Sequence, residues 1–477
     1  MALNSLYYFI FFLVVFCINY FLKPHFRKYF LIISSFVFIS FNNLESLFIL
    51  LFSILSTFYL AKKIENYKTQ ETKKIYFRLS IFLSLSILFL FKYFDTKSGS
   101  FSFLSANFKA ENIIYSLGIS FYTLQNISYL FDIYYKRIPL EKSIVNFTLF
   151  ASYFPKFLMG PITNPSDFIP QIDKTSIQKS SIVIGAQRIL LGLVKKIVIA
   201  DRLSVYVHFN FDINDPFTGL TSLVAVYLFT IQLYFDFTGY MDIALGSSKM
   251  LGFDLKENFN FPLRAISITD FWRKWYISLT SWLTDRVYYP LSFKYRKHKR
   301  LGISFALFTT FMLSGIWHGI SVTFILYALC HAIYMIIELY TLSFREKIAK
   351  ALPVKLHHYL SVIITFNLVS FSFIFFRSTS LEKSIQFFNS IFDLKNFLPS
   401  NWYLDFFSKI ATGGDQKHFF NLAITLLISS AFILFEKTIF KKTVSERLNS
   451  KSIILFILLL ALFGAYTVQE QFIYNQF

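Results

Sequence analysis

Residues 301–337 read LGISFALFTTFMLSGIWHGISVTFILYALCHAIYMII and contain no Asp, Glu, Lys or Arg. An α-helix rises about 1.5 Å per residue, so one helix over this run would be about 55 Å long, whereas the hydrocarbon core of a bilayer is about 30 Å thick. We therefore predict two helices joined by a turn near Ser314–Gly319, where two glycines allow the backbone to reverse direction.

His318 lies at this predicted turn, between Trp317 and Gly319. An ionisable side chain at membrane depth is costly, and it is by default a hypothesis for a functional site. Irregular backbone at that depth is tolerated only where protein buries it or a water-filled cavity hydrates it. We therefore expect His318 to line a passage through the protein. A hydrogen-bonded histidine that only packs helices together is the alternative.

The composition favours a membrane protein and argues against a soluble one. Hydrophobic residues make up 55% of the chain, charged residues 16%, and the mean hydropathy is +0.52. Soluble domains carry roughly 25% charged residues. The formal net charge is +20, but the basic residues cluster in short loops at residues 62–78, 294–300 and 345–350. Such loops are typical of the cytoplasmic, lipid-facing side of a membrane protein, and we expect no nucleic-acid partner.

Apolar segments suited to membrane helices recur along the whole chain. They are Leu6–Leu22, Tyr29–Phe41, Leu47–Leu60, Phe77–Leu90, Ile113–Tyr134, Val145–Leu158, Ile182–Ala200, Ser222–Phe237, Ile303–Ile316, Ile320–Leu339, Tyr359–Phe376, Asn421–Phe435 and Ile453–Ala465. A full crossing takes about 20 apolar residues, or about 17 where the bilayer thins. Because several segments are shorter, we predict about 11 transmembrane helices, with re-entrant and interfacial helices around a central passage.

The predicted fold is thus an all-α, polytopic integral membrane protein with one domain, residues 1–477. The basic segments Ala61–Arg78, Lys294–Arg300 and Lys437–Arg447 are expected in the cytoplasm. The two cysteines, Cys17 and Cys330, lie in apolar runs without the spacing of metal ligands, so we predict no metal site.

Thr238 to Arg300 departs from the transmembrane pattern, because charged residues are interspersed among many aromatic ones. Within it, Phe271, Trp275, Leu279 and Trp282 recur at spacings of four and three, which predicts one amphipathic helix at the membrane interface. Such a helix either anchors the protein to the surface or lines the passage. Its position directly before the His318 hairpin favours lining.

Several of these segments together resemble one protein family. Asp270-Phe-Trp-Arg-Lys-Trp-Tyr-Ile-Ser-Leu-Thr280, followed by Trp282-Leu-Thr-Asp-Arg286, is similar to the central signature of the membrane-bound O-acyltransferase family, and Gly315-Ile-Trp-His-Gly319 is similar to its histidine motif. Further matching blocks are Phe154-Pro155, Gly160-Pro-Ile162, Tyr234-Phe-Asp-Phe-Thr-Gly-Tyr240, Asn258-Phe-Asn-Phe-Pro262 and Phe375-Phe-Arg377. They run in family order from about Ser116 to Ser380. The branch most resembled is that of the bacterial alginate O-acetylase membrane subunit, with the D-alanyl-lipoteichoic-acid transfer protein as a relative.

The resemblance implies an enzyme of the bacterial plasma membrane. It would move an acyl group, expected to be acetyl, from a cytoplasmic thioester donor, acetyl-CoA or an acyl carrier protein, to a hydroxyl of an extracytoplasmic glycan acceptor. It also implies a separate extracytoplasmic acyltransferase as partner and no tightly bound cofactor. His318 matches the catalytic histidine, and the expected binding or tunnel-lining residues are Tyr276, Trp275, Arg273, Asp270 and Trp317. Imidazole, with an ordinary pKa near 6.5, can remove a hydroxyl proton during such a transfer.

Tyr276 is a departure from the family pattern, which usually has histidine at this position. A phenol has an ordinary pKa near 10, so it exchanges no proton readily at neutral pH, but it can donate a hydrogen bond to a developing oxyanion. The tyrosine therefore argues against a two-histidine mechanism. Alternatives are acyl transfer to a teichoic-acid-like acceptor, an inactive scaffold, and a transporter, although the inverted repeats of many transporters are not visible in the sequence.

Overall fold

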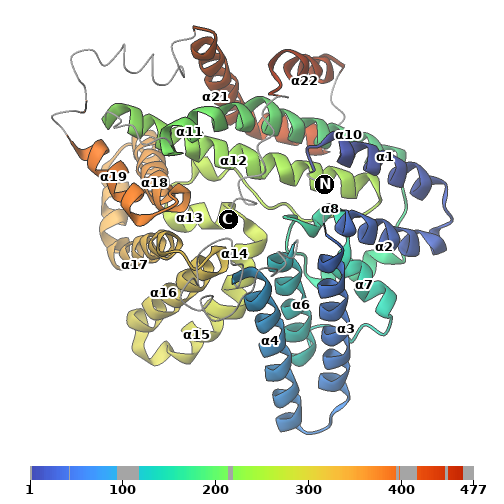
Figure 1. The fold of residues 1–477 in the computed structure, drawn as a ribbon. Helices are drawn as coiled ribbons and strands as arrows, with labels where there is room; N and C mark the ends of the chain where they lie inside the picture. Colours follow the sequence, from blue (N-terminus) through green and yellow to red (C-terminus); the bar gives the residue numbers. More distant parts are fainter. Residues whose placement is uncertain are drawn as a thin grey trace, which may run out of the picture. The chain divides into compact units, whose positions relative to one another are not determined.

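The computed structural model describes residues 3–41, 43–93, 118–212, 219–393, 397, 416–445 and 450–465 (Figure 1). Across these residues the regular structure is helical and contains no β-strand, which confirms the all-α fold. The chain divides into two compact units. Unit 1 comprises Met1–Ile189 and Tyr240–Lys256, and unit 2 comprises Leu190–Gly239 and Glu257–Phe477. A single domain over residues 1–477 stays a prediction.

Seven helices in the described part of the chain are long and apolar enough to cross a membrane. They are Leu44–Asn66, Gln70–Lys92, Gly219–Met250, Arg296–His318, Val322–Ala351, Val354–Arg377 and Leu422–Ile439. Leu6–Phe21 and Ser450–Phe463 are apolar but shorter. The protein is therefore an integral membrane protein with several crossings, and the count of about 11 stays a prediction.

Unit 1 contains the N-terminal helices. These are α1 (Leu6–Phe21), α2 (Pro24–Ser40), α3 (Leu44–Asn66), α4 (Gln70–Tyr93), α6 (Ile119–Tyr134), α7 (Ile144–Ser152), α8 (Phe154–Phe157), α9 (Pro165–Ile172), most of α10 (Lys179–Leu193) and the end of α12 (Gly219–Met250). Helices α3, α4 and α6 pack side by side (Figure 1). Asn43 starts α3, because its Oδ1 accepts hydrogen bonds from the backbone N–H groups of Glu45 and Ser46 at 2.7 and 3.2 Å.

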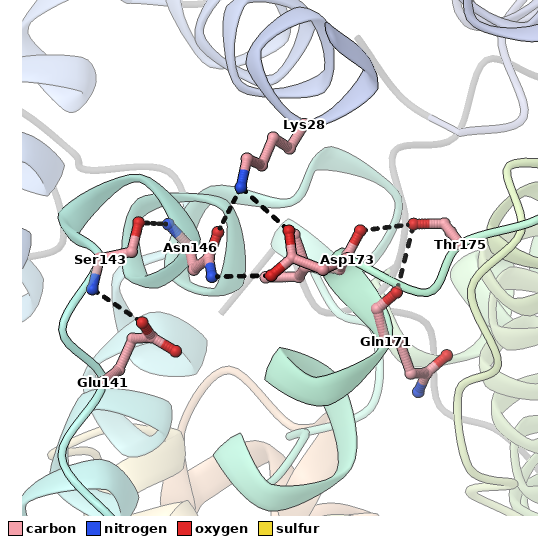
Figure 2. A network of polar contacts seen from close by, with 8 residues as sticks. Lys28, Glu141, Ser143, Asn146, Gln171, Asp173 and Thr175 are labelled. Carbon is pink, nitrogen blue, oxygen red and sulfur yellow. Dashed lines mark hydrogen bonds and ion pairs between the residues drawn. The ribbon is translucent and has the colours of Figure 1, made fainter. Parts of the chain in front are cut away.

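A polar network ties three of these helices together (Figure 2). Lys28 of α2 donates to Asp173 Oδ1 at 2.9 Å and to Asn146 Oδ1 at 3.4 Å. Asn146 of α7 in turn donates to Asp173 Oδ2 at 3.5 Å. Asp173 directly follows α9, so the network holds α2, α7 and α9 in register.

Helices α10 and α12 approach closely within unit 1. A Cβ atom on Gly185 would lie 2.6 Å from the carbonyl oxygen of Gly246, and a Cβ on Gly246 would lie 2.6 Å from that of Gly185. One turn away, Arg188 Nε donates to Asp242 Oδ1 at 3.0 Å, and both side chains are buried. Small residues let the backbones meet, and the pairing compensates two charges that would be costly alone.

Unit 2 contains the rest of the chain. Its helices are the π-helix Val194–Ala200, α11 (Asp201–Asp212), the first part of α12, the 3₁₀ turn Pro262–Arg264, α13 (Ile268–Lys274), α14 (Ile277–Leu283), the π-helix Thr284–Tyr288, α15 (Tyr289–Lys294), the 3₁₀ turn Arg296–His298, α16 (Lys299–His318), α17 (Val322–Ala351), α18 (Val354–Arg377), α19 (Leu381–Phe392), α21 (Gln416–Ser445) and α22 (Ser450–Phe463). Helix α17 packs between α16 and α18 (Figure 1).

A buried ion cluster joins the π-helix Val194–Ala200 to α12. Lys196 Nζ lies 2.7 Å from Asp201 Oδ1 and 2.6 Å from Asp236 Oδ1, and all three side chains are almost fully buried. The two carboxylates compensate the buried ammonium group and fix the π-helix against α12.

One sequence-based boundary needs correction, and two predicted segments lie partly outside the described residues. Helix α12 continues to Met250, so the departure from the membrane pattern begins there and not at Thr238. The basic segment Lys437–Arg447 is largely helical, because α21 runs to Ser445, and its last two residues lie outside the described part. The predicted span Ile113–Tyr134 is described only from residue 118 and forms α6.

Candidate active site

The α16–α17 hairpin turns where the glycines predicted it. Helix α16 ends at His318, Gly319 follows in an extended conformation, and Ser321 starts α17 by accepting a hydrogen bond from the N–H of Thr323 at 3.3 Å. A Cβ atom on Gly315 would lie 2.6 Å from the Cβ of Ala328. The absence of a side chain at Gly315 therefore lets the two helices meet just before the turn.

The His318 ring is surrounded by aromatic rings from three helices. Its centroid lies 4.9 Å from Trp317 of α16, 6.1 Å from Phe324 of α17 and 5.3 Å from Phe376 of α18. The side chain is half-buried. Because His318 is the last residue of α16, it lies at the helix end where carbonyl groups stabilise positive charge. An imidazole placed there can accept a proton and have the resulting cation stabilised.

The predicted amphipathic helix over Phe271–Trp282 is wrong as a continuous element. Two short helices, α13 and α14, are separated at Trp275–Tyr276. Trp275 is extended, and Tyr276 adopts the left-handed conformation with φ 44° and ψ 56°. A bulky residue with positive φ is a strained outlier that persists only where its surroundings hold it. The break thus coincides with the residue that departs from the family pattern.

Hydrogen bonds to the segment around Asn258 stabilise the non-helical backbone at this break. The backbone carbonyl of Asn258 accepts from the N–H of Ile277 at 2.8 Å, and its side-chain Oδ1 accepts from the N–H of Ser278 at 2.7 Å. On the other side of the break, the N–H of Asn260 donates to the carbonyl of Lys274 at 2.9 Å. These bonds replace those that a continuous helix would make, so they stabilise the strained conformation.

Helix α13 is fixed to α17 at two points. Glu338 accepts hydrogen bonds from the backbone N–H groups of Ile268 and Thr269, at 2.7 and 3.1 Å, and from the Thr269 hydroxyl at 2.7 Å. Two turns earlier on α17, His331 Nδ1 accepts from Trp272 Nε1 at 3.2 Å. Because α17 also forms the hairpin with α16, one helix positions both the break and the His318 turn.

His331 is a buried histidine with both ring nitrogens in hydrogen bonds. Since Nδ1 accepts from Trp272, Nε2 carries the proton of the neutral ring and donates to Ser372 Oγ at 2.9 Å. The Ser372 hydroxyl donates onward to the carbonyl of Val369 at 2.6 Å. This arrangement gives His331 a structural role between α13, α17 and α18.

Five aromatic rings lie at the break or next to it, and we call them the aromatic wall: Tyr234, Phe237, Phe259, Trp275 and Tyr276. Phe259 lies 5.2 Å from Trp275 and 5.9 Å from Tyr276, edge-on to both. Tyr234 and Phe237, one turn apart on α12, lie 6.3 and 6.0 Å from Trp275. The aromatic wall is therefore assembled from α12, the segment before Pro262 and the break itself.

One ring, Phe373 of α18, links the aromatic wall to the surroundings of His318. Its centroid lies 5.8 Å from Trp275 and 6.1 Å from Phe376, which in turn lies 5.3 Å from His318. The two predicted parts of the site thus belong to one contiguous aromatic cluster within unit 2.

The predicted site residues divide into two groups. Trp275, Tyr276 and Trp317 are buried in the aromatic cluster. Asp270 instead accepts from the N–H of Ile266 at 3.0 Å and pairs with Lys274 at 2.7 Å, which stabilises α13. Arg273 of α13 is exposed. Asp270 and Arg273 are thus not shown among the rings that surround His318.

Burial determines the protonation of Tyr276. Removal from water disfavours the phenolate and raises the pKa of Tyr276 well above its usual value of 10. The hydroxyl therefore stays protonated through the neutral range. It can serve as a hydrogen-bond donor but not as a base.

Sequence reasoning missed three residues that shape the site: Asn258, Glu338 and Glu436. Asn258 belongs to one of the family-like motifs, but no neighbouring residue in the sequence indicates that it accepts hydrogen bonds from the start of α14. Glu338 and Glu436 each lie at the end of an apolar run, and neither of them was singled out from the sequence. A carboxylate within reach of a membrane span is itself a signal of a buried partner. Among the described residues, no group of three or more His, Cys, Asp or Glu side chains could hold a metal ion.

Comparison with known proteins confirms the resemblance seen in the motifs. The sequence model of the membrane-bound O-acyltransferase family (MBOAT) matches residues 141–381. A peptidoglycan O-acetyltransferase of Helicobacter pylori is 29% identical over 397 residues, covering 76% of this chain and 73% of that protein. A probable alginate O-acetylase of Pseudomonas aeruginosa is 31% identical over 406 residues, covering 82% and 75%. A teichoic acid D-alanyltransferase of Bacillus subtilis is 27% identical over 278 residues, covering 56% and 69%.

Proposed function

Because the chain belongs to the membrane-bound O-acyltransferase family, we propose that it transfers an acyl group, expected to be acetyl, from a thioester donor to hydroxyls of a cell-envelope glycan, with His318 as the general base. Acyl transfer by this membrane enzyme follows from the family. The donor, the acceptor and the role of His318 are the proposal.

The position of His318 carries the proposal. It lies at the C-terminal end of α16, half-buried among Trp317, Phe324 and Phe376. A base in such a place is shielded from bulk water, which limits hydrolysis of the donor, and the helix end stabilises the imidazolium that forms.

The reaction needs one proton to move twice. As the acceptor hydroxyl oxygen attacks the thioester carbonyl carbon, its proton passes to the His318 imidazole. The tetrahedral intermediate then collapses to the ester, the carbon–sulfur bond breaks, and the imidazolium returns the proton to the leaving thiolate. Tyr276, which stays protonated, is suited to donate a hydrogen bond to the developing oxyanion.

The length of α16 supports transfer toward the extracytoplasmic side. This helix has 20 residues and is thus about 30 Å long, close to the hydrocarbon thickness. Its first residue, Lys299, belongs to the basic loop that the positive-inside rule places in the cytoplasm. A helix that crosses the bilayer from there would bring His318 near the far side.

Similar proteins guide the choice of acceptor and donor. Relatives named for O-acetylation of peptidoglycan and of alginate match most of this chain, whereas the teichoic acid D-alanyltransferase matches 56% of it. We therefore favour acetyl transfer to a polysaccharide, with acetyl-CoA or an acyl carrier protein as donor. D-alanyl transfer to a teichoic-acid-like acceptor is the second candidate. An extracytoplasmic acyltransferase is the expected partner.

The first test measures donor consumption and transfer by purified protein in lipid nanodiscs. Radiolabelled acetyl-CoA is supplied with alginate or peptidoglycan fragments, and D-alanyl carrier protein serves as the rival donor. We expect His318→Ala to abolish thiol release and ester formation while the protein remains folded. His358→Ala is the matched control, because His358 is an exposed histidine on α18 and should retain full activity.

Two results would contradict the proposal. Acylation by His318→Ala at the wild-type rate would remove His318 from the chemistry. A wild-type protein that consumes none of these donors, with or without acceptor, would favour the scaffold alternative.

A further inference from the structure

Glu436 is a carboxylate buried in a helix suited to cross the membrane. It lies on α21, within the apolar span Leu422–Ile439, and its exposed fraction is 6%. The family match ends at residue 381, so α21 lies beyond it. Burying a carboxylate at such a position is costly, and it is retained where the group has a partner and a function.

One hydrogen-bond partner of Glu436 is Tyr234, a member of the aromatic wall. The Tyr234 hydroxyl donates a hydrogen bond to Glu436 Oε1. A hydrogen bond to a carboxylate is stronger than one between neutral groups, so it fixes the Tyr234 ring firmly. That ring lies 6.3 Å from Trp275 and 6.3 Å from Phe259, two other members of the aromatic wall.

A second contact holds α21 in the same place. Arg264 Nη2 donates to the backbone carbonyls of Ile433 and Leu434, the latter at 2.8 Å. Arg264 ends the 3₁₀ turn that begins at Pro262, shortly after Phe259. The chain segment that supplies Phe259 to the aromatic wall is thus also hydrogen-bonded to α21, less than one turn before Glu436.

We propose that Glu436 is a positioning residue for acyl transfer: through Tyr234 it fixes the aromatic wall and thereby the conformation of Trp275 and Tyr276. The proposal rests on the proposed function of the His318 site. Its physical basis is that the strained conformation at Tyr276 needs neighbours that do not move. Glu436 supplies this support from an element outside the segment that defines the family.

The experiment compares Glu436→Leu, Glu436→Gln, Tyr234→Phe and the double variant Glu436→Leu/Tyr234→Phe in nanodiscs. We expect Glu436→Leu and Tyr234→Phe each to lower kcat about tenfold, with KM for the donor within about twofold of wild type, because a single strong hydrogen bond is lost. The double variant should be no slower than the worse single variant, since both remove the same bond. Glu436→Gln keeps an acceptor oxygen and should recover most of the rate.

Tyr227→Phe is the matched control. Tyr227 lies two turns before Tyr234 on α12, and its hydroxyl donates to Asn367 Oδ1 of α18 at 2.6 Å. The same chemical change there removes an interhelical hydrogen bond outside the aromatic wall, so kcat should stay within about twofold of wild type.

Hydrogen exchange separates this proposal from the proposed function. Loss of the Tyr234–Glu436 bond should speed amide exchange over residues 268–283, whether or not the right donor has been found. Unchanged exchange and unchanged kcat in Glu436→Leu would overturn the positioning role while leaving acyl transfer intact. Strictly additive losses in the double variant would also overturn it. Failure of every variant and of wild type to transfer acyl groups would count against the function alone, and the exchange data would still decide the role of Glu436.

Discussion

Tyr276 is both buried and held in the left-handed backbone region. Left-handed conformations outside glycine are several-fold enriched in asparagine, aspartate and histidine. The histidine that the family usually places here therefore suits the backbone better than tyrosine does. The Tyr276 phenol supplies a ring to the aromatic wall and a hydrogen-bond donor, but unlike an imidazole it does not titrate near neutral pH.

Tyr276→Phe removes only the hydroxyl and should lower the rate modestly. The loss of one hydrogen bond in a dry site costs about 0.5–1.5 kcal/mol, which corresponds to roughly a few-fold to tenfold in kcat. Because the raised pKa of Tyr276 keeps the phenol neutral, the pH–rate profile between pH 6 and 9 should have the same shape in both proteins. Steady-state kinetics over that range measures both effects.

Tyr276→His is the companion variant, and we expect it to be tolerated, since related sequences place an imidazole there and histidine accepts the left-handed conformation. A loss of about a thousandfold in Tyr276→Phe would show that the phenol takes part in the chemistry, and His318 would then not act alone.

At the scale of the element, the α16–α17 hairpin depends on close contact between two helices. A Cβ atom on Gly315 would lie 2.6 Å from the Cβ of Ala328 and 2.8 Å from the carbonyl oxygen of Phe324. Both distances are too short for a side chain, so any larger residue would push the helices apart. His318 lies one turn further along and would move with them.

Gly315→Ala should therefore lower both the free energy of unfolding and kcat. Overpacking of this kind costs about 1–3 kcal/mol. Thermal unfolding in detergent measures the loss of stability, and kcat measures the displacement of His318. Leu313→Ala, at a position that is 44% exposed on the same helix, should change both quantities little. Equal effects of the two substitutions would show that the close contact is unimportant.

At the scale of the whole molecule, the orientation in the membrane determines which side the donor reaches. The loop between α3 and α4 and the loop before α16 both carry lysines, at Lys68 and Lys297. The positive-inside rule places both in the cytoplasm.

The prediction is that neither loop is reachable from outside. Cys17 and Cys330 are first replaced by alanine, and a single cysteine is placed at Lys68 or Lys297. An impermeant thiol reagent should label neither variant in intact cells and should label both after permeabilisation. Ready labelling of both in intact cells would reverse the orientation, and with it the side proposed for His318.

The membrane class, the family and the hairpin at His318 could be predicted from the sequence, because these depend on local composition and on short contiguous motifs. An apolar run of fixed length has few ways to cross a bilayer, and the glycines at 315 and 319 mark where it turns. The prediction of one continuous helix through Trp275 was wrong because the conformation there depends on contacts with a distant segment. A helical periodicity was present, but hydrogen bonds that Asn258 accepts and Asn260 donates made a break more stable than a continuous helix.

The pairing of polar residues, in contrast, could be known only from the packed fold. In the fold, His331 forms hydrogen bonds with Trp272 and Ser372, two partners that the sequence alone does not identify. Glu436 meets Tyr234, 202 positions earlier in the chain, and no periodicity or local pattern connects two residues so far apart. Hydrogen bonds between distant helices depend on the packing of the whole unit, so their partners become known only once that packing is known.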